Sequence, residues 1–182
     1  MIYKPEEVTD RKGEVCVFRS LKEEDADELG RFVEQGSKET PFFPWESSVS
    51  RLNADTAAEY ILEYESDERK LLLGVFRDGR LIGVTELTRI GEWKKIRHRC
   101  ATAAGMLKKA QGRGLGKKMT QAIIDAAREA GYEQLEATTS VTNEAAAANL
   151  RSLGFQQYGM IPHKLKNNDG SYVDELRFVK WL

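Results

Sequence analysis

A glycine-rich hexapeptide at residues 111–116, Gln-Gly-Arg-Gly-Leu-Gly, is the feature that most constrains this chain. It separates an apolar segment, residues 101–107, from residues 115–130, where apolar residues recur at helical spacing. A turn that opens a helix leaves the first backbone N–H groups without intrahelical partners, and these donors favour an anion. Glycines permit positive φ and close approach of a ligand. The pattern therefore predicts a strand, a polyphosphate-binding loop and a helix.

The sequence of this loop does not match either of two common phosphate-binding motifs. A Walker A loop needs Gly-x-x-x-x-Gly-Lys-Ser/Thr, but Gly116-Lys117 is followed by Lys118 and is preceded at the required position by Gln111. A dinucleotide fingerprint needs Gly-x-Gly-x-x-Gly, whose third glycine would fall at Lys117. The motif that the loop does contain is Gln-x-x-Gly-x-Gly. For the hexapeptide alone, an ordinary glycine turn with solvated lysines stays an alternative.

Composition and charge indicate one domain with an anion-binding surface. The 182 residues are 41% hydrophobic, which is enough for a single domain over residues 1–182. The net charge is -1, but residues 1–70 carry -8 and residues 71–182 carry +7. Most of the positive excess lies in residues 89–118, which hold ten basic residues and one acid. Such asymmetry is typical of an anionic-ligand surface. Nothing in the overall charge indicates a nucleic-acid or membrane partner.

The cysteines and the apolar runs suggest a cytoplasmic protein without a metal. Cys16 and Cys100 are too few for a disulfide scaffold or a zinc site, so we expect reduced core thiols. Residues 1–10 are polar and charged, unlike a signal peptide. The longest apolar runs, such as residues 71–76, are too short to span a bilayer.

The periodicity predicts a mixed α/β domain with the element order βααβββαβαββ. Its sheet is expected to be mostly antiparallel and flanked by helices. Asp78-Gly79-Arg80 predicts a hairpin turn between the second and third strands. The expected strands are residues 15–19, 70–77, 81–88, 98–107, 134–141, 155–160 and 171–181, and the expected helices are 21–33, 54–62, 115–130 and 143–153.

The loop resembles the acetyl-coenzyme A (acetyl-CoA) loop of the GCN5-related N-acetyltransferase (GNAT) superfamily, whose signature is Arg/Gln-x-x-Gly-x-Gly/Ala. Members often carry a second motif, Asn-x-x-Ala-x-x-Leu-Tyr-x-x-x-Gly-Phe. Here Asn143, Ala146, Gly154 and Phe155 fall in register with it. The expected element order also matches that superfamily along nearly the whole chain. The resemblance implies the GNAT fold and acetyl-CoA as cosubstrate.

By this resemblance, the backbone amides of the loop hold the pyrophosphate, and Arg113, Lys117 and Lys118 add positive charge. Pantetheine would lie where the fourth and fifth strands splay apart. An amide of Met106 or Leu107 would polarise the thioester carbonyl and serve as the oxyanion donor. Asn143 would reach the pantetheine, although a plain helix N-cap explains it equally well. The cofactor-binding positions so implied are Met106, Leu107, Lys108, Gln111, Gly112, Arg113, Gly114, Leu115, Gly116, Lys117 and Asn143.

The sequence identifies the catalytic groups less clearly than the cofactor-binding ones, because Leu150 replaces the tyrosine that in this superfamily often protonates the departing thiolate. Related N-terminal amine acetyltransferases of ribosomal proteins also tend to lack this tyrosine. A thiol pKa of about 8.5 needs only modest help near neutrality. Tyr158 and Tyr172 are candidate acids, though each could be a structural tyrosine. Glu86 is the candidate base, directly or through water, unless it simply faces solvent.

Two histidines and one aromatic segment complete the candidates. His98 and His163 are weaker choices for the base. Residues 41–45, with Glu39 and Glu46 beside them, combine aromatic faces and carboxylates that suit a cationic amine. The same residues could cap the core instead.

The predicted function is transfer of the acetyl group of acetyl-CoA to a primary amine, either a small molecule or a protein N-terminus. Direct attack in a ternary complex is expected, because neither cysteine lies in a recognisable nucleophile context. A non-catalytic acyl-CoA-binding sensor is the alternative that Leu150 keeps open. A nucleic-acid-binding domain is disfavoured by the acidic first third and by the lack of a binding motif. A homodimer is compatible with the sequence.

Overall fold

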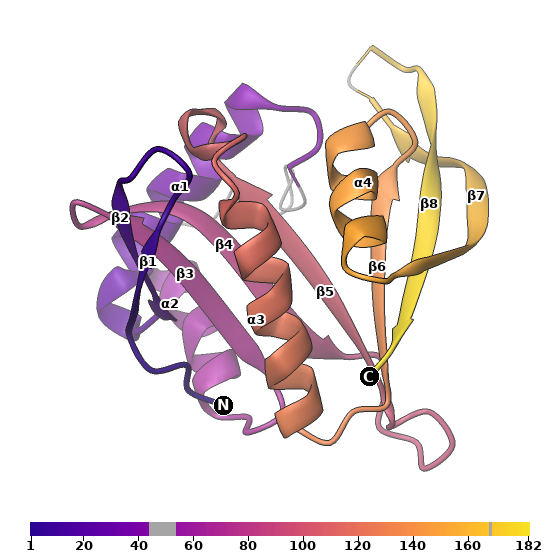
Figure 1. Ribbon diagram of the computed structural model, residues 1–182, viewed down its shortest axis with the longest axis horizontal. Helices are drawn as coiled ribbons and strands as arrows, with labels where there is room; N and C mark the ends of the chain where they lie inside the picture. The colour runs from indigo at the N-terminus through magenta and orange to yellow at the C-terminus, as the bar shows by residue number, and fades with distance from the viewer. Residues whose placement is uncertain (44–53, 168) are drawn as a thin grey trace.

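The strands of the computed structural model, which describes residues 1–43, 54–167 and 169–182, form one eight-stranded sheet (Figure 1). The strand order is β1-β2-β3-β4-β5-β6-β8-β7. The strands are β1 Glu6–Thr9, β2 Val15–Ser20, β3 Leu71–Arg77, β4 Arg80–Arg89, β5 Arg99–Met106, β6 Gln134–Ser140, β7 Gln156–Lys166 and β8 Tyr172–Trp181. The helices are α1 Ala26–Glu39, α2 Ala54–Glu65, α3 Leu115–Glu129 and α4 Glu144–Ser152, with short 3-10 turns η1 Glu23–Asp25 and η2 Lys108–Ala110.

One pair of neighbouring strands creates an opening in the sheet. β5 and β6 are parallel, and their register covers only residues 99–102 of β5 and 134–137 of β6. β5 continues to Met106, where it pairs only with β4. The two strands diverge beyond Thr102, as Figure 1 also shows. The remaining pairs are antiparallel, so the expected mostly antiparallel sheet is confirmed.

Helices cover both faces of the sheet. α3 lies across one face, with α4 beside it over β6, while α1 and α2 cover the other face (Figure 1). The α3 stripe of Leu115, Met119 and Ile123 is fully buried, as helical spacing predicts. Leu29, Phe32 and Ile61 of α1 and α2 are buried in the second apolar layer. Full burial of each such side chain stabilises the fold by about 1.5–3 kcal/mol.

The predicted order of elements is confirmed, with one additional strand. The sequence reasoning missed β1, because Glu-Glu-Val-Thr is short and polar and has one buried residue, Val8. β7 also extends to Lys166, well past the expected end at residue 160. The hairpin turn between β3 and β4 is present, and Asp78 and Gly79 both have positive φ, at 50° and 74°.

The two cysteines lie in the core, as expected. Cys16 and Cys100 are both buried and free. None of the helices among the described residues is long and apolar enough to cross a membrane.

Candidate functional site

The glycine turn leads directly into α3 and leaves backbone donors available. Gly112 and Gly114 have φ of 72° and 83°, and Gly114 is the N-cap of the helix. No side chain of the described residues caps this end. Because the first helical N–H groups lack intrahelical partners, this turn offers a set of donors to an anion. A Cβ added at Gly116 would meet nothing within 4 Å, so the donors lie beside open space.

The end of β5 presents one of the two amides expected as oxyanion donors, that of Met106, to the gap. The N–H of Leu107 donates to the Ile82 carbonyl at 3.0 Å, and the N–H of Lys108 donates to Glu39 Oε2 at 2.6 Å. Hydrogen-bonding directions alternate along an antiparallel ladder. The Met106 N–H, paired in register with Gly83, is therefore directed away from β4 and toward the side where β6 has diverged. The Gln111 side-chain amide donates to the Met106 carbonyl at 3.1 Å.

A cleft of about 940 Å³ occupies the region where β5 and β6 diverge. Its walls come from β5, β6, α4, the end of α1 and the β7–β8 hairpin. Small and hydroxyl side chains line its floor, which lets an extended ligand lie close to the backbone. These floor residues include Thr102, Ala103, Ala104, Thr138, Thr139 and Ser140.

α4 contributes the residues of the second motif to this cleft. Asn143 lines the cleft and is also the helix N-cap, because its Oδ1 accepts the Ala146 N–H at 3.3 Å. Leu150 lines the cleft and is only 7% exposed. Tyrosine is absent from the cleft lining among the described residues. The position where the family often has a tyrosine therefore offers no hydroxyl here.

The Arg113 side chain, which we expected to add charge at the phosphates, is engaged with two acidic side chains of the protein. Its guanidinium turns to the β1–β2 turn, where it donates to Asp10 Oδ2 at 2.7 Å and forms an ion pair with Glu14. Asp10 is buried, and a buried carboxylate requires a cationic partner. The positive charge of Arg113 is thus neutralised inside the protein, whereas Lys117 and Lys118 are exposed.

Glu86 lies between two tyrosines that the sequence reasoning missed. Tyr64 Oη donates to Glu86 Oε2 at 2.9 Å, and Tyr60 Oη donates to the same oxygen. Burial, followed by the nearby Glu86 carboxylate, raises the pKa of Tyr64 far above its ordinary value, so its hydroxyl stays a donor. The signal available in the sequence was a pair of tyrosines one helical turn apart in α2.

The position of Glu86 relative to the cleft follows from the sheet register. Glu86 does not line the cleft itself, but it is directly opposite Ala103, which does. Glu86 is half-buried, and its Oε2 is held by α2 rather than being free in solvent. The alternative of a carboxylate that simply faces solvent is therefore excluded.

The other titratable candidates lie outside the cleft lining. Tyr158 is 54% exposed and donates to Glu136 at 3.4 Å, where β5 and β6 are still paired. The ring of His163 stacks on Tyr172 at 5.4 Å. The carbonyl of His98 accepts the Glu133 N–H at 2.9 Å just before β5 begins. The cleft lining therefore excludes all four side chains.

The aromatic segment after α1 has residues in both of the expected roles, one that caps the core and two that line the cleft. Phe43 is buried beside Phe32, with ring centroids 5.2 Å apart, and caps the core. Pro41 and Phe42 line the cleft, and Phe42 is 40% exposed. Residues 44–46, also named as candidates, lie outside the described residues.

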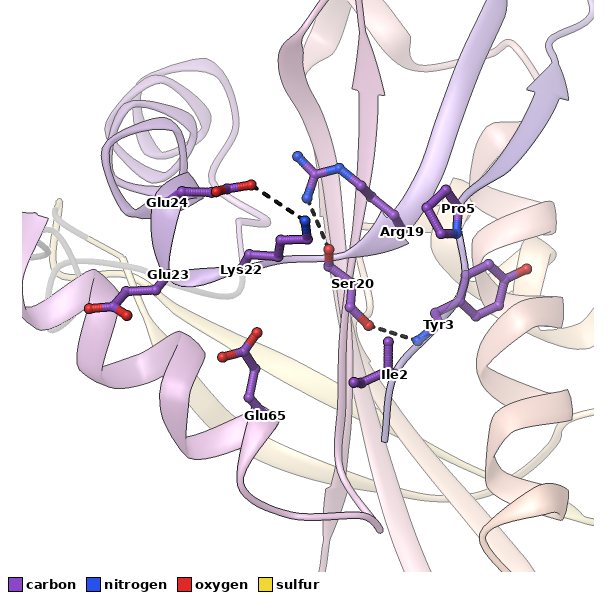
Figure 2. Close-up of a pocket in the computed structure, with 9 residues that line it drawn as sticks. All are labelled: Ile2, Tyr3, Pro5, Arg19, Ser20, Lys22, Glu23, Glu24 and Glu65. Carbon is purple, nitrogen blue, oxygen red and sulfur yellow. Dashed lines mark hydrogen bonds and ion pairs between the residues drawn. The ribbon is translucent and has the colours of Figure 1, made fainter.

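A second hollow, of about 570 Å³, lies between the start of the chain and the start of α1. Figure 2 shows the Lys22 side chain directed toward Glu24, with which it forms an ion pair at 3.5 Å. Arg19, on its wall, is bound to Asp25 at 2.6 Å. Both basic side chains that line this hollow are thus paired with carboxylates. Among the described residues, no group of three or more His, Cys, Asp or Glu side chains is arranged so that it could hold a metal ion.

Comparison with known proteins identifies the family. The model of the acetyltransferase (GNAT) domain matches residues 16–156. N-alpha-acetyltransferase RimI of Mycobacterium tuberculosis is 34% identical over 88 residues, which are 48% of this chain and 53% of that protein. The chain therefore spans about half the length of this curated relative.

Solved structures show the same fold. An acetyltransferase of the GNAT family from Streptococcus pneumoniae superposes with a TM-score of 0.85 at 23% identity, covering 92% of this chain and 99% of that one. YncA from Salmonella typhimurium, solved with acetyl-CoA, gives a TM-score of 0.80 at 18% identity, covering 92% and 94%. Since the domain model matches well over half of the sequence, the chain belongs to the GNAT acetyltransferase family.

Proposed function

We propose that this protein transfers the acetyl group of acetyl-CoA to a primary amine. The observation that carries the proposal is the juxtaposition of two donor sets. The backbone amides of the first turn of α3 lie next to the open space beside Gly116. The Met106 N–H is directed into the gap between β5 and β6. An elongated cosubstrate with a pyrophosphate at one end and a thioester at the other fits that pair of sites.

In the proposed complex, the amides of residues 112–117 bind the pyrophosphate, and Lys117 and Lys118 supply positive charge nearby. The Met106 amide donates to the thioester oxygen as that oxygen gains negative charge. Removing one such donor typically costs about 2.7–4 kcal/mol of transition-state stabilisation. Asn143, at the cleft wall, is proposed to contact the pantetheine arm while still capping α4.

The amine must lose a proton before its lone pair can attack the carbonyl carbon. We assign this role to Glu86, acting directly or through a water molecule across Ala103. Tyr60 and Tyr64 hold the carboxylate in one orientation. Attack forms the new C–N bond, and collapse of the adduct breaks the C–S bond and releases the thiolate. Water is proposed to protonate this thiolate, because its unperturbed pKa of about 8.5 demands little assistance.

The acceptor is proposed to be a small amine or a protein N-terminus. Pro41 and Phe42 give the cleft an apolar wall, and the RimI relative is named for acetylation of an α-amine. These features favour a peptide N-terminus as the first acceptor to test. A cytoplasmic location, a single domain over residues 1–182 and a possible homodimer remain predictions.

The test is calorimetric titration of the protein with acetyl-CoA, followed by thiol release in the presence of amines and N-terminal peptides. Binding with release supports the transferase, and the panel identifies the acceptor class. Binding without thiol release in the presence of any acceptor favours the sensor. Leu150 supports that alternative, as does the lack of a tyrosine in the cleft lining among the described residues. Absence of binding contradicts both functions.

A further inference from the structure

We propose that Asp10 is a positioning residue for the cosubstrate: acting through Arg113, it holds the glycine turn of residues 111–116 in its binding conformation. This inference rests on the proposed function, because the turn is taken to bind acetyl-CoA. Asp10 lies in the turn between β1 and β2, which we call the hairpin tip (residues 10–14).

The carboxylate of Asp10 is engaged on both oxygens. Oδ2 accepts from Arg113 at 2.7 Å and from Arg77 at 2.8 Å. Oδ1 accepts the backbone N–H groups of Lys12 at 2.8 Å and Glu14 at 3.0 Å. The side chain has 0% exposure. Four donors around a buried carboxylate define its position, and it in turn defines the position of the Arg113 guanidinium.

The hairpin tip also contacts the glycine turn without using that carboxylate. The Arg11 N–H donates to the Arg113 carbonyl at 3.0 Å. The Arg11 side chain crosses Gly114 so closely that an added Cβ would lie 3.0 Å from Arg11 Nε. Both the carbonyl and the guanidinium of Arg113 are therefore committed to the hairpin tip.

These contacts orient the neighbouring peptide groups. With Arg113 held on the side of the hairpin tip, the amides that follow it remain at the open start of α3. A loop that is ordered before binding loses less entropy when its ligand arrives. Arg113 thus serves the cosubstrate by being turned away from it.

The test compares two buried aspartate–arginine pairs in the full-length chain. Asp10→Asn keeps the shape and an oxygen for the tip amides but loses the charge that binds Arg113. Asp25→Asn is the matched control, because Asp25 binds Arg19 through two contacts of 2.6 and 2.7 Å, next to the second hollow rather than the glycine turn. Titration calorimetry and steady-state kinetics are performed well below each variant's melting temperature.

We expect Asp10→Asn to weaken acetyl-CoA binding about tenfold and to raise the KM for acetyl-CoA, with kcat and the KM for the acceptor unchanged. Asp25→Asn should lower the melting temperature without altering the acetyl-CoA Kd. If Asp10→Asn does not fold, Glu14→Gln provides the second variant. Glu14 is 46% exposed and is the other acid on Arg113, so a smaller loss of affinity is expected there.

Two results would overturn the inference while leaving the proposed function intact. One is unchanged acetyl-CoA affinity in the folded Asp10→Asn and Glu14→Gln variants. The other is an equal loss of affinity in Asp10→Asn and Asp25→Asn, which would indicate general destabilisation. A wild-type protein that does not bind acetyl-CoA would instead contradict the proposed function itself.

Discussion

Arg113 donates to the carboxylate of Asp10 at 2.7 Å, although 103 positions separate the two residues. The motif alone would place Arg113 among the phosphate ligands, since it lies inside the glycine turn. Its charge is instead used to compensate a buried carboxylate, which would be costly without a partner. The anion-binding groups that we propose for the turn are therefore its backbone amides rather than this arginine.

The Asp10 network should give the protein an acid-sensitive component of stability. Burial alone would raise the pKa of Asp10, but the amides of Glu14 and Lys12 and the Arg113 guanidinium outweigh it and lower the pKa to about 2. A depressed folded-state pKa stabilises the fold above the unfolded value, 3.8, and this contribution is lost as the pH falls through the folded value. Urea denaturation should therefore show the wild-type advantage over Asp10→Asn shrinking between about pH 4 and pH 2. A difference that stays constant across this range would contradict the assignment.

Gly114→Ala should impair both stability and cosubstrate binding. Its φ of 83° costs a non-glycine residue about 1–2 kcal/mol, and the new Cβ would also press on Arg11. Gly131→Ala, beyond the other end of α3, is the matched control, because φ is 73° there but nothing lies within 4 Å. Denaturation should show a loss in both variants, whereas calorimetry should show weaker acetyl-CoA binding in Gly114→Ala alone. Equal binding by the two variants would separate the turn from the cosubstrate.

Glu86→Gln should lower kcat by about 10²–10⁴ while leaving acetyl-CoA affinity unchanged, because it removes the proposed base. Glu63→Gln is the control, since Glu63 lies on α2 but pairs with Lys70 at 2.6 Å and is exposed. Steady-state kinetics and titration calorimetry with acetyl-CoA provide the measurements for both variants. A Glu86→Gln enzyme with full activity would exclude the carboxylate from catalysis.

Tyr158→Phe should leave kcat unchanged, contrary to the catalytic role suggested by the sequence. The tyrosine lies outside the cleft lining, and its hydrogen bond to Glu136 is long at 3.4 Å. Losing that bond should cost at most about 0.5–1.5 kcal/mol of stability. Thiol-release kinetics provide the measurement. A loss of roughly tenfold or more in kcat would restore Tyr158 as a candidate acid.

The sequence by itself determined the features that depend on contiguous residues. The glycines of the turn predicted positive φ, helical spacing identified the buried stripe of α3, and Asn143 was anticipated as a helix cap. Each of these depends on backbone sterics or on hydrogen bonds within a few positions. The order of elements followed from the same local patterns, apart from β1, whose short polar sequence becomes a strand only through pairing with β2.

Only the tertiary structure decided which groups the site can use. The partners of Arg113 and the two tyrosines on Glu86 lie 22 to 103 positions away, so no local pattern contains them. The Leu107 amide was equally plausible as an oxyanion donor until the β4–β5 ladder committed it to Ile82. Long-range contacts decide which of these groups are available to a ligand. A buried charge or amide needs a partner, and it pairs with the group that packing brings near it, whatever their separation along the chain.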